Sequence, residues 1–67
     1  SQELQLSWQA AAGGDVEQRL SRLAAWVDLA DRRGAAYALA LPGVEMPPGR
    51  GDAHRRVALE ELALWQP

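Results

Sequence analysis

Three stretches follow one another with only short connections: ELQLSW at residues 3–8, DVEQRLSRLAAWVDLADRRG at residues 15–34 and AAYALAL at residues 35–41. The first stretch alternates apolar and polar residues, as a strand with one buried face does, and we expect this strand over residues 1–8. The second stretch has helical spacing of its apolar residues, and the third is apolar almost throughout, as in a strand covered on both faces. This order predicts two parallel strands joined by a right-handed helical crossover, which is the beginning of an α/β sheet.

The predicted helix has clear signals at both ends. Asp15 is a favourable N-cap, and Gln18 can complete a capping box with it. Gly34 can adopt the left-handed conformation that ends a helix. The apolar residues at helical spacing form the predicted inward stripe, which is Val16, Leu20, Leu23, Val27 and Ala30. The charged residues form the predicted outer surface, which is Glu17, Arg19, Arg22, Asp28 and Arg32.

The rest of the chain predicts a short edge strand and a second helix. The Pro-Gly pair at residues 42–43 is a turn signal, and residues 44–46 can return antiparallel as an edge strand. The two prolines at residues 47–48 lack a backbone donor, so we expect the strand to end there. Asp52 is the predicted N-cap of a helix over residues 53–64. The core candidates of this helix are Val57, Leu59, Leu62, Ala63 and Trp65.

Size and charge narrow the class of protein. The chain has 67 residues, no cysteine and a net charge of −2. A chain of this size buries only about 60% of its unfolded surface, so we expect it to be part of a larger domain. The charge gives no reason to expect a nucleic acid or an anionic membrane as a partner. An unpaired strand edge favours weak self-association through Trp65 or residues 4–8, and a self-sufficient monomer is the alternative.

No group of side chains predicts a catalytic centre. The loop after the first strand, where α/β sheets perform chemistry, reads QAAAGG at residues 9–14 and holds no nucleophile, acid or metal ligand. His54 is the only imidazole, and no nucleophile lies near it in the sequence, so a packing or surface role is favoured. We therefore predict no enzymatic activity, no catalytic residue, no metal and no cofactor.

Three arginines surround the start of the second predicted helix. Arg55 and Arg56 fall in its first turn, where the helix dipole disfavours a cation, and Arg50 lies in the preceding loop. A carboxylate or phosphate of a partner would explain this cluster, and so would neutral variation at a tolerant surface. Arg50, His54, Arg55 and Arg56 are therefore the candidate partner or anion contacts. Anion or nucleic-acid binding through the three arginines is the alternative function.

Four segments carry a resemblance to a known family: EQRLSRLAAWV at residues 17–27, YALALPG at 37–43, PGRGDAHRR at 48–56 and LEELAL at 59–64. They resemble the bacterial family catalogued as domain of unknown function 58, over nearly the whole chain and at consistent spacing. That family resembles the von Willebrand factor type A fold, a doubly wound α/β sheet. The resemblance implies a β-α-β-β-α fragment of such a sheet. It also implies a cytoplasmic segment of a membrane-anchored bacterial parent that works with a MoxR-type AAA+ ATPase.

The resemblance also implies a degenerate metal site. Active A-type domains carry Asp-x-Ser-x-Ser after the first strand, and its carboxylate and hydroxyls hold Mg²⁺. The corresponding positions here are Ser7, Gln9 and Ala11, and the chain contains no threonine that could add a further ligand. Ala40 stands where the family leads us to expect arginine, and Ala58 where it leads us to expect cysteine. The leading hypothesis is therefore a metal-free, non-enzymatic scaffold that acts through protein contacts.

A metal titration tests this degenerate site. Because Ser7, Gln9 and Ala11 replace the ligand triplet, millimolar Mg²⁺ or Mn²⁺ should leave the melting temperature and the loop amide chemical shifts unchanged. Thermal melts and, for Mg²⁺, nuclear magnetic resonance spectra of the labelled chain check this. A saturable shift centred on residues 7–11 would contradict the prediction.

Overall fold

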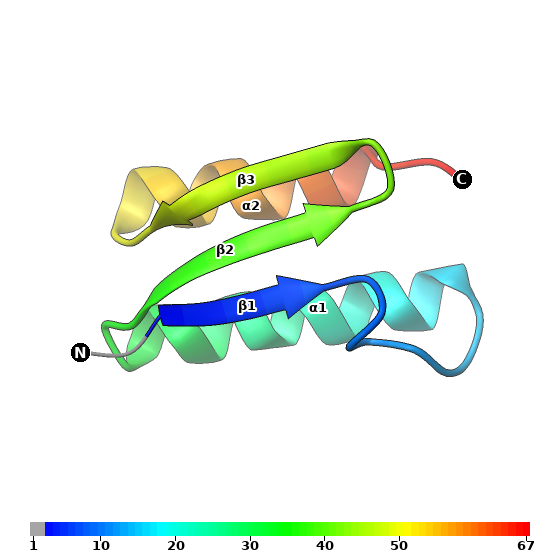
Figure 1. Cartoon of the computed structure of the whole chain (residues 1–67), viewed down its shortest axis with the longest axis horizontal. Helices are drawn as coiled ribbons and strands as arrows, with labels where there is room; N and C mark the ends of the chain where they lie inside the picture. The colour runs from blue at the N-terminus through cyan, green and yellow to red at the C-terminus, as the bar shows by residue number, and fades with distance from the viewer. Residues whose placement is uncertain (1–2) are drawn as a thin grey trace.

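The computed structural model describes residues 3–67, so Ser1 and Gln2 of the predicted first strand lie outside the described residues. The chain forms a three-stranded mixed sheet and two helices in the predicted order β-α-β-β-α (Figure 1). The elements are β1 (Glu3–Ser7), α1 (Val16–Arg32), β2 (Ala36–Leu41), β3 (Val44–Gly49) and α2 (Asp52–Leu64). The α/β fold class is therefore confirmed.

β2 is the central strand of the sheet, whose order is β1-β2-β3. β1 and β2 are parallel, with Leu6 opposite Leu39, and this confirms the pairing predicted for the first two strands. β3 returns antiparallel to β2, with Val44 opposite Leu41 beside the tight turn. The sheet therefore has two edges, β1 and β3.

β3 continues through both prolines, so the expectation that it ends at residue 46 is wrong. Met46 stands opposite Leu39 and Gly49 opposite Tyr37, so three residue steps along β3 match two along β2. The extra residue makes a bulge-like irregularity, and Pro47 and Pro48 lie within it. Prolines are tolerated at such a place because the donors they lack are not needed on an edge strand.

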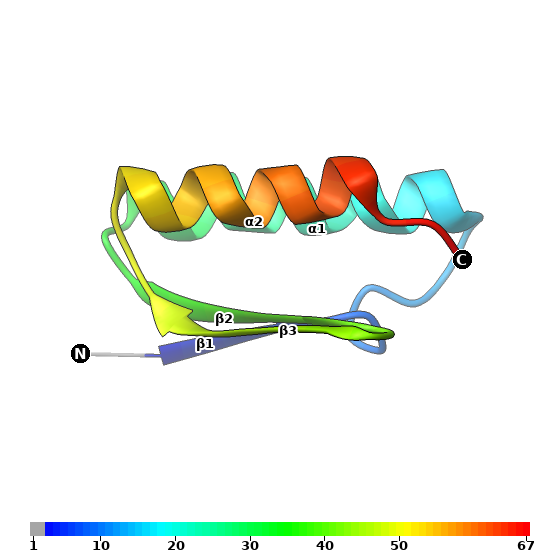
Figure 2. The same ribbon diagram turned by 90° about the horizontal axis from the view of Figure 1, so that it is seen from above.

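Both helices lie on the same face of the sheet (Figure 2). Along β2, Tyr37, Leu39 and Leu41 are buried beneath the helices, whereas the alternating alanines are only half-buried. The expectation that β2 is covered on both faces is therefore wrong for the described residues. The buried core consists of Leu6, Ala11, Leu23, Val27, Ala30, Tyr37, Leu39, Leu41, Ala58 and Leu62.

The ends of α1 follow the sequence signals. The Asp15 carboxylate accepts from the Gln18 backbone N–H at 2.8 Å, and the Gln18 side chain accepts from the Asp15 N–H at 2.9 Å, which completes the predicted capping box. Gly34 has a φ of +65°, and the following N–H of Ala35 donates to the carbonyl of Ala30 at 3.1 Å. This Schellman arrangement satisfies the last carbonyls of the helix and turns the chain into β2.

The inward stripe of α1 is largely as predicted, but its charged surface is not. Leu23, Val27 and Ala30 are buried, and Val16 and Leu20 are half-buried. Three of the residues expected on the outer surface, Arg19, Arg22 and Asp28, are instead half-buried. Their polar ends contact other parts of the chain, as described below.

α2 differs from the prediction in its start and in its buried face. Gly51 occupies the N-cap position and Asp52 is the first helical residue, so the predicted Asp52 cap is wrong. Ala58 and Leu62 are the buried residues, and Leu59 and Trp65 pack partly against the core as predicted. Val57 is 47% exposed, and Ala63 is also exposed, so neither belongs to the core. The small Ala58 side chain, rather than Val57, takes the crowded position beneath the helix.

Two leucines of α1 test this core. Leu23 is fully buried, whereas Leu29 is 45% exposed. Leu23→Ala should cost about 2–5 kcal/mol, enough to unfold so small a domain. Leu29→Ala makes the same chemical change at the surface and should cost about 1 kcal/mol or less. Urea unfolding followed by circular dichroism checks both, and equal losses would contradict the assigned core.

Candidate functional site

The loop after β1, where the resemblance places the degenerate metal site, is held by two arginines of α1. Arg22 donates from Nη1 to the carbonyl oxygens of residues 11, 12 and 13, at 2.7, 3.2 and 3.1 Å. Arg19 donates from Nη2 to the Trp8 carbonyl at 2.6 Å, and its guanidinium lies 3.9 Å from the Trp8 ring centre. Two positive groups therefore face the carbonyl oxygens of this loop.

The three positions that the resemblance assigns to the degenerate metal site lie at the end of β1 and in the loop after it. The Ser7 hydroxyl accepts from the backbone N–H of Ala10 at 3.1 Å, and the methyl group of Ala11 is fully buried in the core. Gln9 is exposed. Over residues 3–67, no three His, Cys, Asp or Glu side chains are grouped so that they could hold a metal ion. A cation brought to the loop carbonyls would also meet the charge of Arg22.

A second polar cluster joins the two helices. Arg55 of α2 donates from Nε to the Asp28 carboxylate of α1 at 3.0 Å, and its Nη2 lies 3.0 Å from the same oxygen. Asp31 is farther away, with 3.9 Å between its Oδ2 and the Arg55 Nε. Both side chains of the Arg55–Asp28 pair are about 40% exposed, so the pair contributes only about 0–1 kcal/mol. The pair therefore links the two helices but adds little to their stability.

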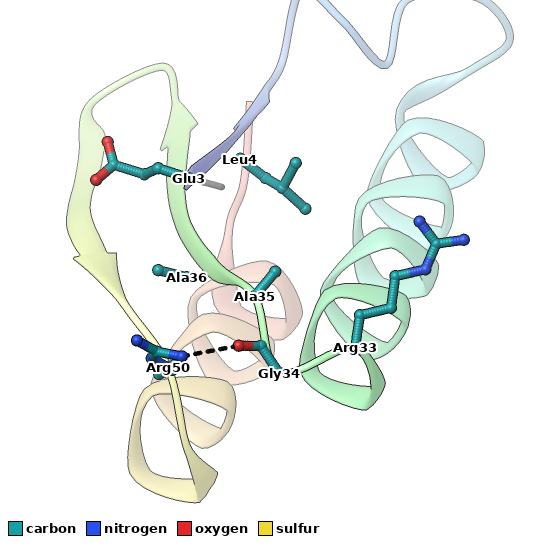
Figure 3. A pocket seen from close by; sticks show the side chains of 7 residues that line it. All are labelled: Glu3, Leu4, Arg33, Gly34, Ala35, Ala36 and Arg50. Carbon is teal, nitrogen blue, oxygen red and sulfur yellow. Dashed lines mark hydrogen bonds between the residues drawn. The ribbon is translucent and has the colours of Figure 1, made fainter. Parts of the chain in front are cut away.

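The three arginines of the predicted basic cluster are not equivalent. Arg50 donates from Nη1 to the carbonyl of Gly34 at 3.0 Å and so ties the loop before α2 to the end of α1 (Figure 3). Arg55 is engaged with the carboxylates of α1. Arg56 is exposed and has no hydrogen bond or ion pair within the part of the chain that the structure describes. Two of the three arginines therefore make contacts within the folded chain.

His54 packs against β2 and β3. Its Nε2 lies 2.9 Å from the Tyr37 carbonyl, which can only accept, so this nitrogen carries a proton and donates. The two rings meet edge to face with centroids 4.7 Å apart. Any side chain at Gly49 would collide with the imidazole, since a Cβ there would lie 2.7 Å from Nδ1. The geometry gives His54 a packing role, with glycine needed beside it.

The sequence does not mark Tyr37 as a functional residue. It is fully buried, and its hydroxyl has no hydrogen-bond partner within the described residues. Burial raises the pKa of this phenol above its ordinary value of 10.0, and the nearby Asp31 carboxylate raises it further. A tyrosine in an apolar strand looks like any other core residue in the sequence, so nothing signalled this unpaired group.

Two surface hollows lie at opposite ends of the strands. The first, of about 540 Å³, is at the start of β1 and β2, and its charged side chains do not converge, because Glu3 and Arg33 point apart (Figure 3). Its lining is Glu3, Leu4, Arg33, Gly34, Ala35, Ala36 and Arg50. The second lies at the carboxyl ends of β1 and β2, where α/β proteins usually bind ligands, and Gln9 and Glu45 are its only polar side chains. Neither hollow presents a set of groups that could carry out a reaction.

Comparison of the chain with protein-family models, curated proteins and solved structures finds no match. In the described residues, neither helix is long and apolar enough to cross a membrane. The family resemblance therefore stays a prediction.

Tyr37→Phe tests the buried phenol. Near neutral pH the variant should be as stable as the unmutated chain (the parent chain), or slightly more stable. The reason is that the lost hydroxyl has no hydrogen-bond partner among the described residues. Above pH 10 the parent should lose stability, since the unfolded chain then releases the phenol proton while the folded chain retains it. The variant should lack this loss.

Urea unfolding at increasing pH measures the effect, and the absorbance of the single tyrosine reports its ionisation directly. The chain contains no lysine, so no ammonium side chain titrates in the same range. A parallel decline of the two proteins above pH 10 would show that Tyr37 is not responsible.

Proposed function

We propose that this chain is a non-enzymatic protein-interaction segment, of the kind its resemblance to the domain of unknown function 58 family implies. The observation that most supports this is the open face of the sheet. Both helices cover one face, and no described element covers the other (Figure 2). Some domains add a third layer to such a sheet, so the bare face is a surface on which another protein layer can pack.

The strand register defines the residues of this open face. Glu3, Gln5 and Ser7 of β1 stand opposite Ala36, Ala38 and Ala40 of β2, and Glu45 of β3 stands opposite Ala40. Directly opposed residues share a face, so a row of three alanine methyl groups lies beside the polar residues of β1. Small side chains in the middle let another protein surface approach closely, and the carboxylates of Glu3 and Glu45 favour a partner with basic groups.

The polar groups elsewhere support a structural rather than a chemical function. Arg19, Arg22 and Arg50 donate to backbone carbonyls, and Arg55 pairs with carboxylates of α1. Only Arg56 of the predicted basic cluster is left for an anion in the described chain, so anion or nucleic-acid binding is less favoured than protein contact. The resemblance suggests a MoxR-type AAA+ ATPase as the partner and a cytoplasmic segment of a membrane-anchored parent as the context.

Two alanine variants and a purified MoxR-type ATPase test this proposal. Ala38→Arg places a long cation in the middle of the open face, and Ala25→Arg makes the same change on the exposed side of α1. Calorimetric titration should show saturable binding to the parent chain and to Ala25→Arg. Ala38→Arg should bind at least about tenfold more weakly, because the arginine separates the surfaces and buries a charge.

Thermal melts establish that both variants fold. If the parent chain does not bind, or if the two variants bind equally well, the proposed partner or the proposed face is wrong.

A further inference from the structure

We propose that the free edge of β1 binds one extended polypeptide segment as a fourth strand, and that this segment alternates apolar residues with basic ones. The inference rests on the proposed protein-interaction function and names a specific edge and the chemistry of its partner. It concerns backbone pairing at the side of the sheet, which is a different surface from the open face.

The peptide groups of β1 alternate between the two sides of the strand. The N–H of Trp8 donates to the Ala40 carbonyl of β2 at 2.9 Å, so the even-numbered residues direct their peptide groups toward β2. Glu3, Gln5 and Ser7 therefore direct theirs away from the sheet, where no described strand lies. The Ser7 carbonyl accepts from the N–H of Ala11, whereas the outward N–H groups have no partner within residues 3–67, so an added strand can pair with them.

The two edges of the sheet differ in how well they are protected. β3 carries Pro47 and Pro48 within a register irregularity, and both features hinder the pairing of a further strand. β1 has the sequence ELQLS, without proline, lysine or irregularity in its register. β1 is therefore the edge that a new strand can join.

α1 determines which side chains the added strand needs on the inner side. α1 lies over β1 in both views (Figures 1 and 2). Asp28 of α1 faces α2, where it pairs with Arg55. Trp26 is two residues earlier in the same helix and therefore lies on the opposite flank, toward the free edge of β1. Trp26 and Leu4 are only partly buried, and Leu29 of α1 is 45% exposed. Apolar side chains of an added strand would cover this partly exposed group.

The outer side of the added strand meets a different surface. Its side chains there would lie beside Glu3, Gln5 and Ser7 on the open face. Glu3 is the one charged residue of β1, and it is exposed. A lysine or arginine beside it would be attracted, whereas an acidic residue would be repelled. The partner strand is therefore apolar on its inner side and basic on its outer side.

A second copy of the chain does not fit this edge when a two-fold axis perpendicular to the sheet keeps all the helices on one face. Paired strands lie about 4.8 Å apart, whereas packed helices need about 8–10 Å between their axes. If β1 paired with β1 of another copy about a two-fold axis, each α1 would lie over its own β1 and the two helices would collide. A single strand without a helix above it avoids this collision.

A blocked peptide of alternating valine and lysine is the probe for this edge. Added to the labelled full chain, it should cause saturable amide shifts and slower hydrogen exchange at residues 3, 5 and 7. Gln5→Pro removes an outward donor that β2 does not use, so the fold is preserved while affinity should fall at least about tenfold. Gln5→Ala keeps the donor and should bind as the parent chain does.

Changes in the probe make the test independent of whether the proline variant folds. A peptide methylated on the alternate nitrogens that face β1 should lose binding to the parent chain, and one with glutamate in place of lysine should bind more weakly. Absence of saturable shifts, or shifts that persist in folded Gln5→Pro, would overturn the proposal.

Two further outcomes identify other occupants and would also overturn it. Shifts confined to Ala36, Ala38 and Ala40 would place the peptide on the open face and leave the proposed function intact. A dimer in sedimentation equilibrium, with shifts at residues 3, 5 and 7 as the chain is concentrated, would identify a second copy as the occupant. If the peptide binds at β1 while the ATPase does not bind, the proposed ATPase partner fails and the strand site stands.

Discussion

The fold depends on the packing of β2 against both helices at once. β2 is the only described strand with a neighbour on each side, and its inner residues Tyr37 and Leu39 are fully buried. Leu23 of α1 and Ala58 of α2 are buried in the same layer. Because there is only one such layer, a change that disturbs β2 reaches the packing of the sheet and of both helices together. The described residues form one core cluster, so within them no second core can compensate.

This one-sided core also determines which surfaces are left for interaction. Once Tyr37, Leu39 and Leu41 face the helices, the strand alternation directs the β2 alanines to the opposite face. The same alternation turns the free peptide groups of β1 outward beneath the flank of α1. The open face and the β1 edge are therefore consequences of how the core is built, and neither needs a special loop. Trp8 and Trp65, with ring centroids 4.6 Å apart, are partly buried and pack against this core.

Local signals made much of the fold predictable. The Asp15 capping box, the Gly34 ending and the order of elements each depend on residues close in sequence, so they could be predicted. The buried face of α2 depends on its neighbours in space. Val57 and Ala58 are adjacent and both apolar, so the sequence does not show which of them is buried. The smaller side chain, Ala58, occupies the crowded position beneath α2, and Val57 is exposed. The continuation of β3 through its prolines likewise depends on its being an edge strand.

At the candidate site, the sequence itself shows that Ser7, Gln9 and Ala11 supply no carboxylate. It does not predict which side chains contact the carbonyl oxygens of the loop. Arg19 and Arg22 were expected in solvent because they are charged, yet a long side chain can lie along a protein surface and direct its cation to a distant carbonyl. Three loop carbonyls converge on the Arg22 guanidinium, which places a positive charge beside them. A loop of alanine and glycine is thereby fixed without any ligand. Since its carbonyls are already engaged, we propose the open face and the β1 edge, rather than this loop, as the surfaces for interaction.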